Sequence, residues 1–262
     1  MLQWRSTTRA GQNFMRKKIM STTPTLKHRI QRGDVVVALR VLITISRAQL
    51  EDALARGTYD FLYLDGQHTA FSDDQLVRFC AMAEALKLPV QFRIPHTRHT
   101  YLIGRYLDLG LTSIMVPEVE TVATAEEAIT YAYYPPIGQR SWGGVARRKA
   151  PHGHSERRAY ADWWNDNVVL TLQLESVQAI INAGALAKPG VDALAFGPND
   201  LEFSLEMHPD FPLRTVDECM RNVTAQVLGS GVRLSMAVPT VAAEREKFLD
   251  MGVTIFQELP RP

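Results

Sequence analysis

Short apolar runs alternate with stretches of helical periodicity from Asp34 to the end of the chain, and this alternation narrows the choice of fold more than any other feature. The runs of strand length are residues 35–43, 60–64, 90–94, 113–116, 168–174, 192–196, 231–237 and 253–256. The helical patterns between them are residues 47–56, 73–86, 99–109, 124–131, 176–187, 216–228 and 241–250. Strand, helix and strand in repetition predict parallel pairing with right-handed crossovers. Eight such strands in 262 residues predict an α/β fold, a closed (β/α)8 TIM barrel, over an open sheet.

The composition excludes several classes of function. The formal net charge is +1, with acidic and basic residues interspersed, so no strong field favours nucleic acid or an anionic membrane. No apolar stretch reaches the length of a membrane span, and Cys80 and Cys219 do not form a metal-binding CxxC pair. The expected partner is a small molecule, and the expected compartment is the reducing cytoplasm.

The N-terminal segment has a different composition from the rest. Eight basic residues and no acidic residue precede Asp34. We expect residues 1–24 to form a basic arm, disordered or used for targeting, and residues 25–262 to form a single barrel domain that opens with a short helix. Two alternatives stay open: the domain opens near Met20 behind an upstream start codon, or the segment is a mitochondrial transit peptide.

Ionisable side chains follow several predicted strands at their carboxyl ends. Asp65 and His68 follow the second strand, Arg93 lies in the third near its end, Glu175 follows the fifth and Asp200 follows the sixth. The active site of such a barrel is built at the carboxyl ends of its strands, so these five side chains are expected to meet in one cavity. Two carboxylates without a nearby cysteine favour a hard divalent cation such as magnesium or manganese, completed by oxygens of water and substrate.

Each of these residues also has a simpler interpretation. Asp65 can close a turn with its side chain, and His68 can be a solvated loop residue. Arg93 can form a structural ion pair, and Glu175 can be an acid favoured by the N-terminus of the following helix. Asp200 can likewise begin a helix. The spacing in the sequence leaves both interpretations open.

Six segments resemble, in this order, the HpcH/HpaI aldolase family, the metal-dependent class II pyruvate aldolases related to citrate lyase. They are GTYDFLYLDGQHTAFS, FRIP, LDLGLTSIMVPEVET, YPPIGQRSWGG, LQLES and GVDALAFGPNDL. His68 and Arg93 are 25 residues apart, and so are Glu175 and Asp200. The resemblance extends from about Leu26 to the last residues. It implies a TIM barrel of the phosphoenolpyruvate/pyruvate type.

The resemblance also implies a role for each residue at the strand ends. Glu175 and Asp200 would hold a divalent cation, magnesium, manganese or cobalt, that binds the carboxylate and keto oxygens of a pyruvate unit. Arg93 would contact the keto oxygen that becomes the enolate oxygen. His68, oriented by Asp65, would act with a metal-bound water as the acid and base toward the aldol hydroxyl.

Further residues are expected to contact the substrate, namely Gln67, Gly197, Pro198, Asn199, Arg140 and Trp142. In the GPND segment Pro198 has no N–H, so Asn199 and Asp200 would donate to the pyruvate carboxylate. Arg140 and Trp142 lie in a long insertion at residues 133–167. Trp142 stands where the family usually has a small or aliphatic residue, and it is expected to shape the substrate pocket or to be a packing anchor.

Two features depart from the family pattern. Gln67 stands where the family usually has glutamate, which removes a negative charge near the metal and is expected to weaken the activation of water. The last segment, GVTIFQELPRP, ends at about the eighth strand, so the usual C-terminal eighth helix is expected to be missing. A homo-oligomer, a hexamer or trimer of dimers by resemblance, would then help to cover the flank of the barrel.

The predicted activity is that of a carbon–carbon lyase that cleaves or forms 4-hydroxy-2-oxo acids through a metal-bound pyruvate enolate, with an oxo acid and an aldehyde as partners. No lysine occurs in the six segments, which disfavours chemistry through a Schiff base. One alternative is an oxaloacetate decarboxylase-type or related lyase, which stabilises the same enolate. Another is a non-catalytic homologue that binds pyruvate or another oxo acid without turnover.

Overall fold

The strands close into a barrel in which each strand pairs in parallel with its sequence neighbours and β8 pairs with β1. The computed structural model describes residues 24–143, 156–238 and 242–261. The strands are β1 Val36–Arg40, β2 Phe61–Asp65, β3 Val90–Arg93, β4 Ser113–Val116, β5 Val169–Leu174, β6 Ala193–Phe196, β7 Arg233–Val238 and β8 Val253–Glu258. Each lies within two residues of a predicted apolar run or inside it, and the predicted TIM-barrel class is confirmed.

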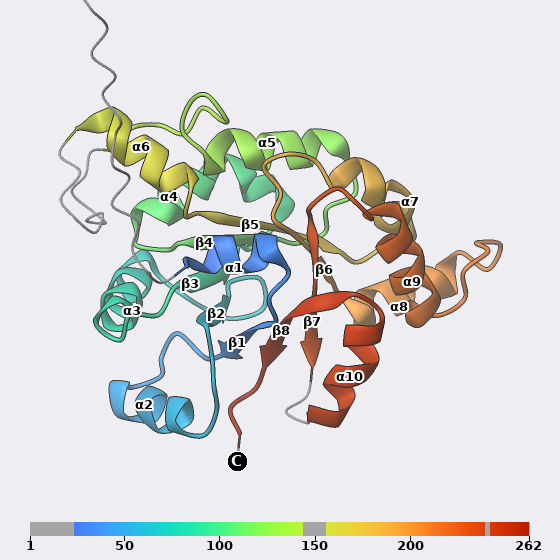
Figure 1. The fold of residues 1–262 in the computed structure, drawn as a ribbon, viewed down its shortest axis with the longest axis horizontal. Coiled ribbons are helices and arrows are strands. Elements are labelled where there is room, and N and C mark those ends of the chain that lie inside the picture. Colours follow the sequence, from blue (N-terminus) through green and yellow to red (C-terminus); the bar gives the residue numbers. More distant parts are fainter. Residues whose placement is uncertain (1–23, 144–155, 239–241, 262) are drawn as a thin grey trace, which may run out of the picture.

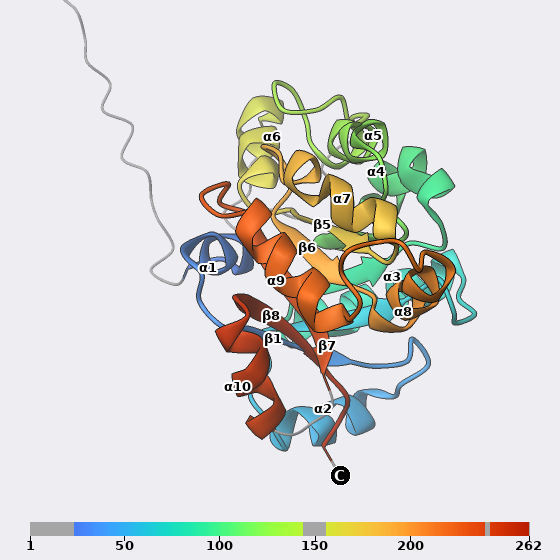
Figure 2. The same ribbon diagram turned by 90° about the vertical axis from the view of Figure 1, so that its right-hand side faces the viewer.

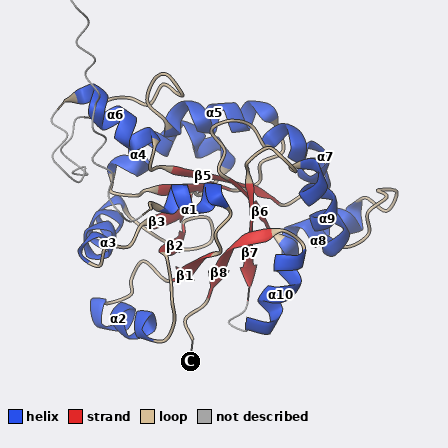
Figure 3. Cartoon of the chain, viewed as in Figure 1, coloured by secondary structure: helices blue, strands red, loops and turns tan. Residues whose placement is uncertain are grey.

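Helices form a ring outside the strands, as Figures 1 and 3 show. They are α2 Arg47–Ala55, α3 Asp73–Ala85, α4 Ile103–Asp108, α5 Val122–Ala132, α6 Arg157–Asn165, α7 Val177–Leu186, α8 Pro198–Met207, α9 Val216–Gln226 and α10 Ala242–Asp250, with the 3₁₀ helix η1 Thr97–Leu102 before α4. In Figures 1 and 2 the C-terminal residues leave β8 on the side of the barrel where α2 and α10 lie. None of the described helices is long and apolar enough to cross a membrane.

Polar residues at the helix starts define where the outer helices begin. Ser46 Oγ accepts from the backbone N–H of Gln49, and Gln49 Oε1 accepts from the backbone N–H of Ser46. The two bonds form a capping box before α2. Thr215 and Glu218 form the same arrangement before α9. These caps satisfy N–H groups that the first turn of a helix leaves unpaired, and they fix the residues at which α2 and α9 begin.

Alternate side chains along the strands point into the barrel and out toward the helices. The inward side chains include a buried polar group, in which Gln91 Nε2 donates to Ser113 Oγ at 3.0 Å and to Thr171 Oγ1 at 3.1 Å. They also include an apolar set: Val36, Ala38, Phe61, Tyr63, Met115, Val169, Ala193, Ala195 and Ile255. The same inward positions become charged toward the carboxyl ends, at Arg40, Asp65 and Arg93. The strand period thus fills the barrel interior with a packed, largely apolar core and lines its carboxyl end with ionisable groups.

A short helix, α1 Leu26–Arg32, covers the amino ends of the strands, with Leu26 and Ile30 packed on the inward apolar set. Its Lys27 is buried, and the ammonium donates to Asp192 Oδ2 at 2.9 Å, Val168 O at 2.8 Å and Tyr133 Oη at 2.9 Å. All three ammonium hydrogens therefore have acceptors, and one ion pair ties the helix to the start of β6.

The structure differs from the predicted elements in three places. The helical pattern at residues 99–109 divides into η1 and α4, and the insertion at residues 133–167 contains α6, which was not predicted. Helix α8 lies where no helical pattern was predicted, and it begins at Pro198, directly after Gly197 and two residues before the alternative helix start at Asp200. The basic arm predicted at residues 1–24 lies, apart from its last residue, outside the described residues.

Candidate active site

A cavity of about 360 Å³ opens at the carboxyl ends of the strands. Eight predicted site residues line it, namely Asp65, His68, Arg93, Glu175, Gly197, Pro198, Asn199 and Asp200. They come from the ends of β2, β3, β5 and β6, although up to 135 residues separate them in the chain. Barrel closure brings these four strand ends to one face, as the sequence predicted.

Arg93 is locked in place by a two-point ion pair with Asp65. The two residues are direct partners across β2 and β3. Arg93 Nε lies 2.9 Å from Asp65 Oδ1, and Nη2 lies 2.5 Å from Oδ2. Burial works to raise the pKa of Asp65, but the hydrogen bonds and charge of Arg93 outweigh it, and the pKa is lowered overall. The guanidinium thus faces the cavity in one fixed orientation, with Nη1 3.3 Å from Gln173 Oε1.

Asp65 also closes the turn that follows β2. Its Oδ1 accepts from the backbone N–H groups of Gln67 at 2.9 Å and His68 at 3.4 Å. The turn-closing alternative for Asp65 is therefore observed together with its role beside Arg93. The carboxylate meets the backbone of His68 and not its imidazole, so it orients the histidine through the turn. The imidazole itself is exposed at the mouth of the cavity.

Glu175 is a buried carboxylate at the end of β5, with 6% of its surface exposed. Its Oε2 accepts from the backbone N–H of Glu118 at 2.8 Å. Burial, helped by the nearby charge of Asp200, outweighs the opposing effects of the Glu118 N–H and Arg93, and the net pKa of Glu175 is raised to about 7. Asp200 lies in the first turn of α8 and lines the same cavity. The two predicted metal ligands therefore share one cavity and interact electrostatically.

Gly197 gives the Glu175 side chain its space. A Cβ atom at position 197 would lie 2.4 Å from Glu175 Oε1 and 2.6 Å from its Cγ. The glycine immediately precedes α8, which starts with Pro198 as its first residue. The carboxylate of Glu175 thus packs directly against the backbone of the loop that carries Asp200.

Glu118 is a site residue that sequence reasoning missed. It has a positive φ of 53° after β4, and its backbone N–H contacts Glu175. Its Oε1 accepts from the Gln67 amide at 2.9 Å, and its Oε2 lies 3.4 Å from His96 Nε2. Gln67 therefore sits at the rim next to Glu118 and does not line the cavity. The available signal was a carboxylate two residues past a predicted strand, in VPEVE.

Arg140 and Trp142 are not brought to this cavity. Arg140 is 5% exposed, its guanidinium carbon lies 4.2 Å from the Trp164 ring centre, and its Nη2 lies 2.7 Å from Asp108 Oδ1. Trp142 packs against Tyr134 and Tyr160, with ring centres 5.7 Å and 5.4 Å away. Cation–π and ring contacts hold both residues in an aromatic cluster. The placement of Trp142 is that of a packing anchor.

The fold and the cavity define a class of protein: a TIM-barrel enzyme whose strand ends assemble two carboxylates, a histidine and an anchored arginine. The sequence profile of the HpcH/HpaI aldolase/citrate lyase family matches residues 41–258. The chain belongs to the HpcH/HpaI aldolase/citrate lyase family. It is accordingly an enzyme of the carbon–carbon lyase class.

Two relatives that are named aldolases and a solved structure agree with this assignment. The chain is 31% identical over 226 residues to 2-keto-3-deoxy-L-rhamnonate aldolase of Klebsiella pneumoniae, covering 84% of this chain and 81% of that protein. It is 30% identical over 213 residues to 5-keto-4-deoxy-D-glucarate aldolase of Escherichia coli O157:H7, with 78% of each chain covered. The crystal structure of an HpcH/HpaI aldolase from Desulfitobacterium hafniense superposes with a TM-score of 0.75, at 24% identity and 90% coverage of each chain, which supports the fold.

Proposed function

We propose that this protein is a divalent-metal-dependent aldolase that cleaves or forms 4-hydroxy-2-oxo acids, with a pyruvate enolate as the shared intermediate. The observation that carries the proposal is the meeting of Glu175 and Asp200 in one cavity with the anchored Arg93. The aldolase names of the two relatives support the same reaction class.

The residues present fit a hydrated divalent cation. The described residues contain no cluster of three or more His, Cys, Asp or Glu side chains placed to bind a metal, so the protein would not supply a complete set of ligands by itself. Glu175 and Asp200 would therefore be two protein ligands of a cation that takes its other oxygens from water and substrate, as magnesium and manganese do. Glu175 is nearly enclosed and its pKa is raised to about 7, first by burial, so a cation would offset the cost of its charge.

The chain's own groups supply the rest of the chemistry. When bound, the cation would act as a Lewis acid toward the 2-oxo acid. Arg93, fixed by Asp65, would hold the oxygen on which negative charge develops as the carbon–carbon bond breaks. The backbone N–H groups of Asn199 and Asp200, in the first turn of α8, would donate to the carboxylate of the oxo acid. His68 would move the proton of the aldol hydroxyl, because an imidazole titrates near neutral pH.

Removal of metal tests the proposal. Exhaustive chelation is expected to abolish the release of pyruvate from a panel of 4-hydroxy-2-oxo acids, and added magnesium, manganese or cobalt is expected to restore it. Pyruvate release is followed with a coupled reduction assay. Full activity after chelation would refute metal dependence. Turnover of oxaloacetate without aldol cleavage would instead favour the decarboxylase, and calorimetric binding of pyruvate without any product would favour a non-catalytic binder.

The affinity for metal is expected to depend on pH near neutrality. A metal ligand must be deprotonated, and burial raises the pKa of Glu175 to about 7 in the metal-free protein. As the pH falls below about 7 protons compete for Glu175, so the apparent affinity for manganese should fall by up to roughly tenfold per pH unit. Calorimetric titrations from pH 5.5 to 8.5 measure this. A constant affinity between pH 5.5 and 7 would contradict it.

Gly197→Ala is expected to weaken metal binding without unfolding the barrel. The new Cβ would meet Glu175 Oε1 at 2.4 Å and push the carboxylate out of its place. We expect the dissociation constant for manganese to rise by at least about tenfold, similar to the loss of an orienting contact around a metal ligand. Gly184→Ala is the matched control, because its Cβ would come no closer than 3.4 Å to any neighbour. Equal affinities in the two variants would contradict the role of Gly197.

A further inference from the structure

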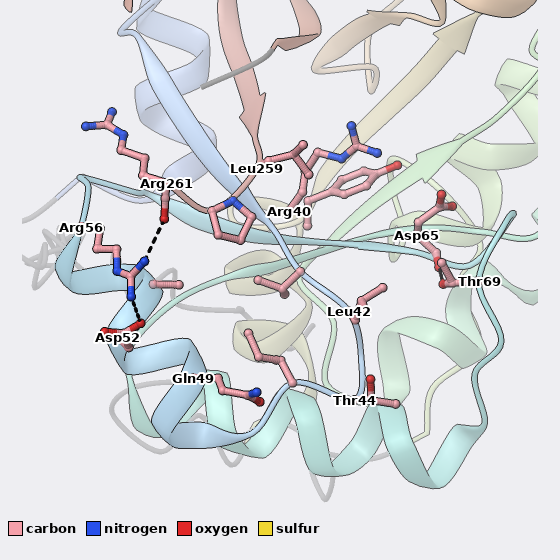
Figure 4. A pocket seen from close by; sticks show the side chains of 15 residues that line it. Arg40, Leu42, Thr44, Gln49, Asp52, Arg56, Asp65, Thr69, Leu259 and Arg261 are labelled. Carbon is pink, nitrogen blue, oxygen red and sulfur yellow. Dashed lines mark hydrogen bonds and ion pairs between the residues drawn. The ribbon is translucent and has the colours of Figure 1, made fainter. Parts of the chain in front are cut away.

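A second cavity of about 600 Å³ adjoins the active-site cavity. It lies between the segment after β1, helix α2 and the residues that follow β8, as Figure 4 shows from close by. The two cavities share three lining residues, Arg40, Tyr63 and Asp65. A molecule bound at the carboxylates of β5 and β6 can therefore extend past these three residues into a space of its own.

Most charged groups on this second cavity already have partners. Arg56 Nη2 lies 2.5 Å from Asp52 Oδ2, and its Nη1 donates to the carbonyl of Arg261 at 3.2 Å, both visible in Figure 4. Arg261 Nη2 lies 3.6 Å from Glu258 Oε2. Asp65 is taken by Arg93. Glu258 also pairs with Arg245, so Arg261 shares its counter-ion with a second guanidinium.

Arg40 is different. Within residues 24–143, 156–238 and 242–261 its guanidinium has no hydrogen-bond or ion-pair partner, and its contact is with the Tyr63 ring, 5.7 Å from the ring centre. A guanidinium stays protonated in proteins, so Arg40 places a permanent positive charge where the two cavities meet. A half-buried charge without a counter-ion is costly unless water or a bound anion offsets it.

Tyr63 offers a second donor at the same place. Its phenol makes no hydrogen bond to any of the described residues, although the side chain is 3% exposed and lines both cavities. Burial raises the pKa of Tyr63, so the hydroxyl remains protonated and able to donate. Register pairing places Arg40 directly beside Tyr63 across β1 and β2.

The closed strand order sets Arg40 apart from the carboxylate of β5, whereas Tyr63 on β2 is close enough to Arg93 to interact with it electrostatically. β1 stands four strands from β5 in an eight-stranded ring, so Arg40 is on the rim opposite Glu175. An oxo acid whose carboxylate is held at β5 and β6 would reach Arg40 with its other end. We propose that Arg40 and Tyr63 bind an anionic group, a carboxylate or a phosphate, on the aldehyde half of the substrate. This inference rests on the proposed aldolase function.

Binding measurements test it without turnover. The probes are 2-oxoadipate, which has a second carboxylate, and 2-oxohexanoate, which has the same chain length without one. In the presence of manganese, we expect calorimetry to show that the protein binds 2-oxoadipate at least about tenfold more tightly, since a hydrogen bond between charged groups is stronger than a neutral one. Arg40→Met should remove this preference and leave 2-oxohexanoate affinity within about twofold, while Arg40→Lys should keep part of it.

Controls separate local recognition from general charge. Arg47→Met removes a nearby cation of α2 that pairs with Glu51 and lines neither cavity, so the preference should persist. Equal affinity for the two probes in the unaltered protein, or an equal loss for both in Arg40→Met, would overturn the inference while leaving the aldolase proposal intact. Failure of both probes to bind with metal would overturn the proposed function and this inference together.

Condensation assays distinguish the two sources of negative charge. Pyruvate is supplied with succinic semialdehyde or butanal, and separately with glyceraldehyde 3-phosphate or glyceraldehyde. If the charged member of a pair has the higher kcat/KM and Arg40→Met removes the difference, the site recognises that anion. The pair that shows the effect then identifies the anion as a carboxylate or a phosphate. Equal kcat/KM values within both pairs would contradict the inference.

Discussion

Glu175→Gln is expected to lower kcat/KM for pyruvate release by about 1000-fold or more, because it removes a charged ligand from a cation that stabilises the developing enolate. The amide has nearly the same shape, and its oxygen can still accept the Glu118 N–H at the observed 2.8 Å. The substitution also removes a buried carboxyl group whose pKa is raised to about 7. The variant should therefore unfold at no lower temperature than the unaltered protein. The loss would therefore reflect chemistry and not stability.

The measurement combines steady-state kinetics, calorimetric titration with manganese and a thermal melt. Glu202→Gln is the matched control, since this exposed carboxylate lies on α8 close to Asp200 but does not line the cavity. It should keep both activity and affinity for metal. An unchanged affinity for manganese in Glu175→Gln would show that Glu175 is not a ligand of the cation.

Of the proposed variants, Lys27→Met is expected to lower the free energy of unfolding the most. The substitution leaves the Asp192 carboxylate buried, 5% exposed, without its counter-ion. Breaking a buried ion pair from one side costs about 3–5 kcal/mol, which corresponds to a fall of roughly 10 °C in the midpoint of thermal unfolding for a domain of this size. The hydroxyl of Tyr133 and the N–H of Leu170 would remain as neutral partners of Asp192.

Thermal and denaturant melts check this prediction. Lys188→Met is the comparison, because Lys188 pairs with Glu126 at the surface, where an ion pair contributes about 1 kcal/mol or less. Adding Asp192→Asn to Lys27→Met should recover part of the loss, since the uncompensated charge is then gone. If Lys27→Met melts within about two degrees of Lys188→Met, α1 is not anchored by this ion pair.

The barrel could be predicted because its strands are short, apolar and separated by helical periodicity. The pairing of β2 with β3 follows from the strand order, and the observed register places Asp65 opposite Arg93. Helix α6 was missed because it lies in a polar, histidine-containing insertion whose pattern is short. Its N-terminal cap, Glu156, is also an uncommon capping residue. A helix of nine residues gives little periodic signal of its own.

The site was predictable in part for a similar reason. Side chains directly after strands share one face, so Glu175 and Asp200 could be placed together from the sequence. Glu118 contacts Glu175 through its backbone N–H in a left-handed conformation, so the only signal in the sequence was its place two residues after a predicted strand. Arg140 and Trp142 were assigned from a motif, but their position depends on partners in α4 and α6. The free guanidinium of Arg40 could be recognised only when the partners of its neighbours were known.

The two ends of the short strand β6 have different roles: Asp192 before it holds α1 through Lys27, and Gly197 after it gives Glu175 its space in the active site. Asp192 precedes it and Gly197 follows it, so a rise of about 3.3 Å per residue puts the two positions roughly 16 Å apart. At the end of β1, by contrast, a change at Arg40 breaks no ion pair among the described residues. Laboratory evolution toward new acceptor aldehydes therefore has more freedom there. Libraries that randomise residues 192–197 would lose folded members through Asp192 and active members through Gly197.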